Sequence, residues 1–187
     1  MAKARRKPSN SSRQRGNTRN RAKPGRRGSP PDAIELLKQD HRNVETWFAE
    51  FEKARSDERK QRLADRICSA LKVHTKLEEE IFYPAFREAT AEEEMYHEAE
   101  VEHESAEELI SKLERSSPGD ERYDAQVKVL SHMIEHHVYE EEKRDGIFAK
   151  ARKADIDVEE LGAQMSKRKA QLEGREEKGL LGALMGS

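Results

Sequence analysis

One short phrase, His-x3-Glu-Glu, occurs twice in this chain and limits the folds that the chain can adopt. The two copies begin at His74 and at His137. Residues four apart on an α-helix project from the same face, with Cβ atoms about 5 to 6 Å apart. Each phrase continues an apolar stripe with steps of three or four residues, so its His and Glu point to the same side as the Leu, Ile and Ala residues. The chain must therefore bury ionisable side chains on at least two helices.

Each phrase is preceded by a single histidine at almost the same distance. His41 lies 33 residues before His74, and His103 lies 34 residues before His137. Both of these histidines also interrupt apolar stripes. The repeat predicts a duplicated helical hairpin, in which the first helix of each copy supplies one His and the second supplies His-x3-Glu, with pseudo-twofold symmetry between the copies.

The apolar periodicity extends over four long segments joined by short links. It predicts helices at about 33–54, 58–89, 91–115 and 120–151, the last with an irregularity around Gly146. Asp32 is the expected N-cap of the first helix, and Pro84 is expected to kink the second near its end. Four such helices predict an all-α, up-down-up-down four-helix bundle. A short C-terminal helix, at about 158–172, is expected to pack across this bundle.

Charge divides the chain into unlike parts. Residues 1–31 carry eleven Lys or Arg and no acid, whereas the remainder holds 25 basic and 38 acidic residues. A segment with so few apolar side chains is expected to be disordered. We therefore expect a disordered basic tail (1–31), a four-helix bundle (32–153) and a C-terminal helix with a frayed end (154–187). The tail either binds nucleic-acid phosphates without sequence preference or serves only as a soluble extension, and the sequence favours neither.

The compartment is predicted from what the chain contains and lacks. Cys68 is the only cysteine, so no internal disulfide can form, which favours a reduced, cytoplasmic protein. No apolar run approaches the roughly 20 residues of a membrane span. The basic N-terminal segment lacks the apolar stretch that a secretory signal peptide contains, so a secretory signal is not expected.

Ionisable residues on core-facing stripes need partners. Burying an unpaired charge costs several kcal/mol, and Asp and Glu are almost never fully buried alone. A single buried His is more often a hydrogen-bonded core residue than a metal ligand, but a duplicated set on four helices favours metal. Imidazole suits iron, zinc or copper, and carboxylates can bridge two ions. The predicted ligands of a metal pair are His41, His74, Glu78, His103, His137 and Glu141.

Over about residues 33–151 the sequence resembles the hemerythrin-like family, also called the HHE cation-binding domain. The phrases that carry the resemblance are Asp40-His41-Arg42, His74-x3-Glu78-Glu79 with Ile81-Phe82-Tyr83-Pro84, Glu102-His103, and His137-Val138-x2-Glu141-Glu142. The resemblance implies two non-haem iron ions, oxo- or hydroxo-bridged, with the two Glu carboxylates bridging the irons and the histidines completing the ligation. It also implies chemistry with oxygen or its reduced forms.

One departure from the oxygen carriers of this family alters the expected function. Those proteins take a His-x3-His pair from the third helix, whereas Ala99 stands four residues before His103 here. The chain is closer to the subset with His, His-x3-Glu, His and His-x3-Glu, which implies reaction with, or sensing of, O2, peroxide or nitrogen oxides. Enzymatic turnover, catalase-like or of another oxidoreductase type, stays open. The alternative is an iron storage or sensing module without turnover, associated with nucleic acid through the basic tail.

Several neighbouring residues have roles that the sequence leaves less defined. Glu100 is expected to be solvated rather than a ligand, and the helical register favours His137 over His136, although the sequence leaves a ligand role open for both Glu100 and His136. Glu79 and Glu142 either accept hydrogen bonds from ligand imidazoles or lie in solvent. Tyr83 is expected to be a packing residue.

Overall fold

The computed structural model describes residues 31–185, with side chains described as far as Gly174. The predicted disordered tail, apart from Pro31, lies outside the described residues. Within that range the chain forms helices and links and no strand. The elements are α1 (Ala33–Lys53), α2 (Asp57–Leu77), the π-helical segment η1 (Glu78–Phe82), α3 (Tyr83–Ala89), α4 (Glu93–Leu113), α5 (Tyr123–Glu142), α6 (Ile147–Ala151) and α7 (Val158–Met185).

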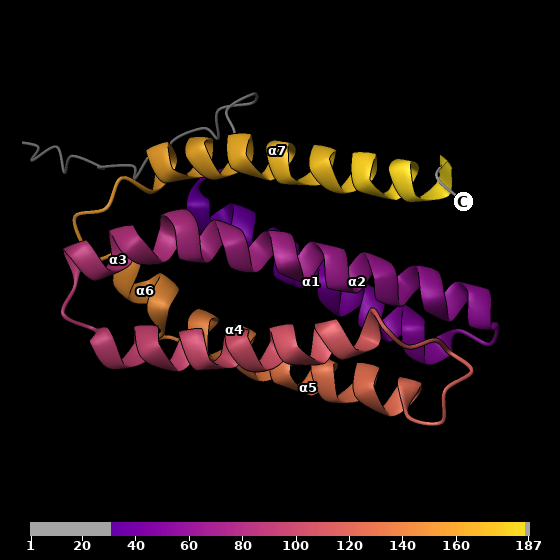
Figure 1. Cartoon of the computed structure of the whole chain (residues 1–187). Coiled ribbons are helices and arrows are strands. Elements are labelled where there is room, and N and C mark those ends of the chain that lie inside the picture. Colours follow the sequence, from indigo (N-terminus) through magenta and orange to yellow (C-terminus); the bar gives the residue numbers. More distant parts are fainter. Residues whose placement is uncertain (1–30, 186–187) are drawn as a thin grey trace, which may run out of the picture.

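The predicted all-α bundle is confirmed. Its four rods are α1, α2 with its extension through η1 and α3, α4, and α5 (Figure 1). The helix pairs α1–α2 and α4–α5 form two hairpins, which contact each other through α1–α5 and α2–α4. The helix α7 lies outside this bundle along α1 and α2 (Figure 1). The two hairpins are the two copies that the sequence repeat predicts.

Side-chain caps fix where the helices begin. The Asp32 carboxylate accepts a hydrogen bond from the backbone N–H of Glu35 at 2.9 Å, as expected for the N-cap of α1. The start expected near Asp120 is wrong, because α5 begins at Tyr123. Asp120 instead closes the preceding turn, where its carboxylate accepts the backbone N–H of Ser117 at 2.7 Å.

The second rod is continuous from α2 to the end of α3, but it widens at η1. The N–H of Tyr83 donates to the carbonyl of Glu78, five residues back. Pro84 has no N–H to donate, and it follows this wider turn as the second residue of α3. Single π-helical turns inside α-helices are frequent at functional sites. Here the turn begins at a predicted metal ligand.

The irregularity expected around Gly146 in the fourth helix is a complete break. The helix α5 ends at Glu142, and α6 begins at Ile147. At Gly146 a Cβ would lie 2.3 Å from the carbonyl oxygen of Glu140, so only glycine fits this close approach. The break places Phe148 of α6 against His41, with ring centroids 5.8 Å apart.

The C-terminal helix α7 runs to Met185, beyond the expected end at Leu172. It approaches α1 closely, because a Cβ on Gly162 would lie 2.3 Å from the carbonyl oxygen of Pro31. Met165 and Leu172 are buried in an apolar cluster shared with α1, α3 and α6. No helix in the described range is long and apolar enough to cross a membrane.

Candidate metal centre

The structure brings all six predicted ligands together inside the bundle, between its two apolar clusters. None of the six is more than 6% exposed. They come from both hairpins, and their donor atoms form two groups that share one carboxylate. The residues are His41 on α1, His74 on α2, Glu78 at the start of η1, His103 on α4, and His137 and Glu141 on α5.

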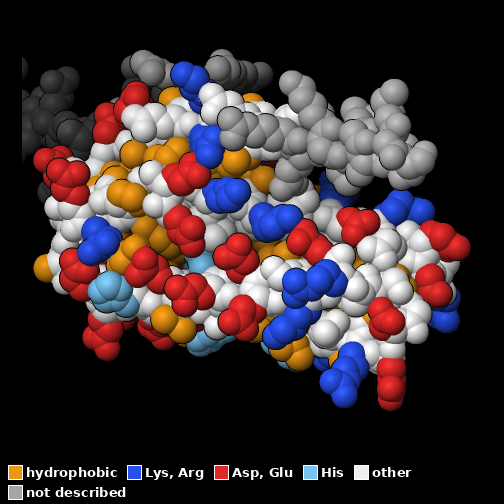
Figure 2. Space-filling view, viewed as in Figure 1, with side chains coloured by type: hydrophobic (Ala, Val, Ile, Leu, Met, Phe, Trp, Pro, Cys, Tyr) orange, Lys and Arg blue, Asp and Glu red, His pale blue; other side chains and the backbone are white. Residues whose placement is uncertain are grey.

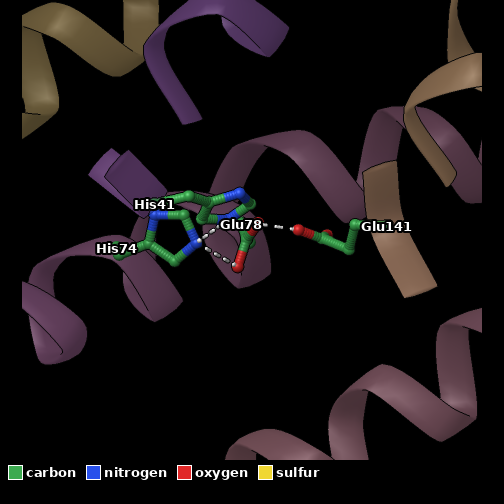
Figure 3. A group of neighbouring side chains, drawn as sticks. All are labelled: His41, His74, Glu78 and Glu141. Carbon is green, nitrogen blue, oxygen red and sulfur yellow. Dashed lines mark hydrogen bonds and ion pairs between the residues drawn. The ribbon is translucent and has the colours of Figure 1, made fainter. Parts of the chain in front are cut away.

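The first group contains the two histidines of the first hairpin and both glutamates. Its imidazoles and carboxylates converge on one point (Figure 3). The Nε2 atoms of His41 and His74 are 3.1 Å apart. An oxygen of Glu78 lies 3.2 Å from Nε2 of His74, and an oxygen of Glu141 lies 3.4 Å from Nε2 of His41.

The second group contains the two histidines of the other hairpin together with Glu78. The Nε2 atoms of His103 and His137 are 3.4 Å apart. The same oxygen of Glu78 lies 3.3 Å from Nε2 of His103, and the same oxygen of Glu141 lies 3.6 Å from Nε2 of His137. Each glutamate therefore faces one histidine from each hairpin.

The opposite ring nitrogen of each histidine faces a carboxylate outside the two groups. Nδ1 of His41 lies 2.9 Å from Glu142, and Nδ1 of His103 lies 3.3 Å from Glu79. Of the two roles left open for these glutamates, the structure favours contact with the imidazoles. A carboxylate on the far nitrogen orients a ligand imidazole and raises its basicity.

Two further carboxylates face the remaining Nδ1 atoms, one at hydrogen-bonding distance and one farther away, and neither was predicted from the sequence. Nδ1 of His137 lies 2.8 Å from Glu102, and Nδ1 of His74 lies 3.9 Å from Asp40. Each carboxylate directly precedes the single histidine of its hairpin, as Asp40-His41 and Glu102-His103. The repeated acid-His dipeptide was the signal that could have revealed them.

Tyr83 contributes more than the packing that was expected. Its buried hydroxyl donates a hydrogen bond to Glu141 at 3.0 Å. Its ring stacks on the ring of His103 with a centroid separation of 5.6 Å. Burial and the charges of Glu141 and Glu78 raise the pKa of Tyr83 well above its ordinary value, so the phenol keeps the proton that it donates.

The model of the hemerythrin HHE cation binding domain family matches residues 32–146. The chain belongs to this family. A solved structure of a hemerythrin HHE cation binding domain-containing protein from Mycobacterium kansasii is similar to the chain, with 30% sequence identity and a TM-score of 0.65. The similarity covers 78% of this chain and 89% of that one. No curated protein sequence matches the chain.

Membership of the HHE domain family implies a metal cofactor, and the buried donors fit one. Both oxygens of Glu78, one of Glu141 and Nδ1 of His74 are buried without a hydrogen-bond partner. Two donors about 2.1 Å from a shared ion are separated by roughly 3.0 to 3.4 Å, which is close to the Nε2–Nε2 separations in both groups. Buried, unpartnered carboxylates of this kind are otherwise costly.

In the metal-free site of the HHE domain, protons bind to some of the donor atoms that a metal ion would otherwise occupy. Burial lowers the pKa of His74, but the charge of Glu78 and the nearby Asp40 carboxylate outweigh it and raise that pKa to about 10. Burial lowers the pKa of His41 to about 4. Burial and the Glu78 charge raise the pKa of Glu141 well above its ordinary value. Protons thus balance the buried carboxylates, and a metal ion would displace them.

The excluded neighbours lie at the edge of the HHE domain's site or outside it. Glu100 pairs with His97 at 3.0 Å and belongs to neither donor group. His136 is 61% exposed, with Nε2 3.4 Å from Glu102. Glu98, Glu102 and His136 form a third, outer His/Glu group. Acidic side chains gather over α4, toward the lower left of Figure 2.

A cavity of about 130 Å³ adjoins the centre. It lies on the side of the apolar cluster that contains Val44, Leu71 and Ile110. The four histidines line one end, and mostly apolar side chains line the rest, together with polar ones such as Lys72, Thr75 and Glu79. These apolar residues are Val44, Leu71, Ala106, Ile110, Met133, Ile134 and Val138. The exposed residues Lys76 of α2 and Glu107 of α4 also belong to its lining, so the cavity reaches solvent between these two helices.

Proposed function

We propose that this chain binds two non-haem iron ions and that they react with O2, peroxide or a nitrogen oxide. The observation that carries the proposal is that two buried glutamates each face one histidine from each hairpin. Such ions, when bound, supply one-electron redox chemistry and positions for small ligands. The proposed ligands are His41, His74, Glu78, His103, His137 and Glu141.

The protein residues would divide the work of holding the pair. His41 and His74 would bind one position through Nε2, and His103 and His137 would bind the other. Glu78 and Glu141 would bridge both positions. Each ion would then have about four protein donors, fewer than the six of an octahedral site, which leaves room for a small substrate.

The shape and lining of the cavity support a small, weakly polar substrate. A volume of about 130 Å³ beside the histidines suits a diatomic molecule or peroxide and excludes large organic substrates. The apolar walls would keep bulk water from the donors. The exposed Lys76 and Glu107 would mark the entrance.

Turnover can be tested by peroxide consumption and oxygen release by the iron-loaded protein. We expect many equivalents of peroxide to be consumed per chain, and Glu78→Gln to abolish the activity. Glu108→Gln is the matched control, because Glu108 is exposed on α4 and outside both donor groups. Consumption of no more than one equivalent by iron-loaded wild type would contradict catalysis.

The second candidate is a storage or sensing module that binds the same ions without turnover. The burial of the ligands supports this candidate. Metal binding at such a buried site is coupled to the stability of the bundle, so the bundle can report whether the metal is bound. Stoichiometric oxidation followed by a change in the unfolding midpoint, with no sustained peroxide consumption, would support this candidate over the catalytic one.

Nucleic-acid association through residues 1–31 belongs to the same proposal. The eleven basic residues of this segment are its support. Binding to duplex DNA of mixed sequence should weaken steeply as salt rises. Equal binding by a chain that begins at residue 32 would contradict it.

A further inference from the structure

The side of the centre that contains His74 is covered by α7, which follows the residues matched by the family model. Lys169 of α7 forms an ion pair with one oxygen of Asp40, and the two side chains are only 25% and 11% exposed. The other Asp40 oxygen lies 3.9 Å from Nδ1 of His74. A cation on the outer helix thus contacts a carboxylate whose second oxygen faces a proposed ligand.

The position of Lys169 is set by the packing of the whole helix. The adjacent Arg168 donates two hydrogen bonds to Glu80 in η1, at 2.7 and 2.9 Å. On the same helix, Met165 is fully buried and Gly162 touches the backbone at Pro31. These contacts hold α7 against η1 and the start of α1, so Lys169 meets Asp40 from a fixed backbone.

A groove between α7 and the first hairpin reaches Asp40 from outside. It holds about 320 Å³ and is lined by Asp40, Trp47, Arg66, Lys169 and Glu173, among others. If Lys169 is removed, water can enter this groove and solvate the Asp40 carboxylate. A solvated carboxylate is free to turn away from His74.

The matching carboxylate in the other hairpin has a different neighbour. Glu102 lies 2.8 Å from Nδ1 of His137 with one oxygen and 3.4 Å from His136 with the other. His136 is an exposed side chain on α5, whereas Lys169 is half-buried on a separate helix. The two halves of the centre are therefore supported in different ways.

We propose that Lys169 is a positioning residue for the metal centre. It holds the Asp40 carboxylate beside Nδ1 of His74, which fixes that imidazole with Nε2 toward the metal position. This inference rests on the proposed metal binding, and it adds that α7 supports one metal position more than the other.

The test compares metal loss from loaded protein to an excess of chelator. Lys169→Met should release about half of the bound metal roughly 10-fold faster than wild type, the size expected when such a supporting contact is lost. Lys167→Met is the matched control, because Lys167 is exposed two residues away, and it should behave as wild type. Asp40→Asn should reproduce the fast phase, and the double variant should release metal no faster than Asp40→Asn alone.

That last comparison separates positioning from general stability. If Lys169 only stabilised α7, its effect would persist in the Asp40→Asn background and would appear equally in urea unfolding of the metal-free proteins. Either result, or release from Lys169→Met at the wild-type rate, overturns the inference while leaving metal binding in place. Wild-type protein that retains no metal would overturn both this inference and the proposed function.

Discussion

The half of the centre on α1, α2 and η1 and the half on α4 and α5 share a ligand pattern but differ in what surrounds it. In each half a carboxylate precedes a single His, and a His-x3-Glu-Glu phrase follows on the next helix. After Glu78 the chain continues into η1 and reaches Tyr83, whereas after Glu141 it breaks at Gly146. The proposed metal donors follow the repeat, and the contacts that support them do not.

The difference is clearest at the two glutamates that face the single histidines. Glu142 is 19% exposed and also pairs with Lys38 and Arg42, while Glu79 is 47% exposed. A carboxylate held by two cations and shielded from solvent orients its imidazole more firmly. Equivalent ligands in the two halves therefore have unequal support.

The largest expected effect comes from substituting a glutamate that contacts histidines of both halves. Glu78→Gln should lower bound metal from about two ions per chain to near zero, because this carboxylate faces a histidine from each hairpin. Glu141→Gln should do the same. Elemental analysis of purified protein measures this, with Glu108→Gln expected to retain the wild-type amount. A full metal complement in Glu78→Gln would refute the bridging role.

Removing one single histidine should affect only its own half. His41→Ala and His103→Ala should each retain about one ion per chain, since the other pair of imidazoles remains with both glutamates. The combined variant should retain almost none. Loss of all metal from either single variant would mean that the two positions fill only together.

Substitution of Glu142 or Glu79, which contact the single histidines, should affect metal binding unequally in the two halves. Glu142→Gln should weaken metal binding by about 10-fold, the lower end of the range for such supporting contacts. Glu79→Gln should have a smaller effect, because its contact to His103 is longer, at 3.3 Å, and more exposed. Competition with a chelator gives both affinities, and a larger effect at Glu79 would reverse the proposed order.

The smallest effect concerns two buried tyrosines in metal-free protein. Tyr83→Phe should lower the free energy of unfolding by about 1 to 3 kcal/mol, since Glu141 loses a buried hydrogen bond. Tyr123→Phe is the control, because the Tyr123 hydroxyl is buried without a hydrogen-bond partner, and it should be neutral or slightly stabilising. Urea unfolding measures both. Equal losses would show that ring packing, not the hydroxyl, determines the cost.

Periodicity was enough to predict the bundle, because the apolar stripes set which face of each helix is buried. The donor set followed from the same rule, since His and Glu on a core-facing stripe must meet. An irregularity around Gly146 was predicted, but the full separation of α5 from α6 was not, because it depends on how closely the backbone packs on Glu140. Nor was the full length of α7.

The supporting carboxylates were harder to predict because their partners lie on other helices. Asp40 and His74 are far apart in the sequence, and their contact depends on the pairing of α1 with α2. Lys169 is still farther away, on a helix whose placement no repeat specifies. Local patterns identify which residues are buried, but only the packed bundle shows which carboxylate faces which ring.

If the two hairpins together hold a pair of iron ions, protein purified from its native source should contain about two irons per chain. It should also show a visible absorption band that changes on adding azide or peroxide. One zinc ion per chain, with no visible band, would contradict the proposed iron pair.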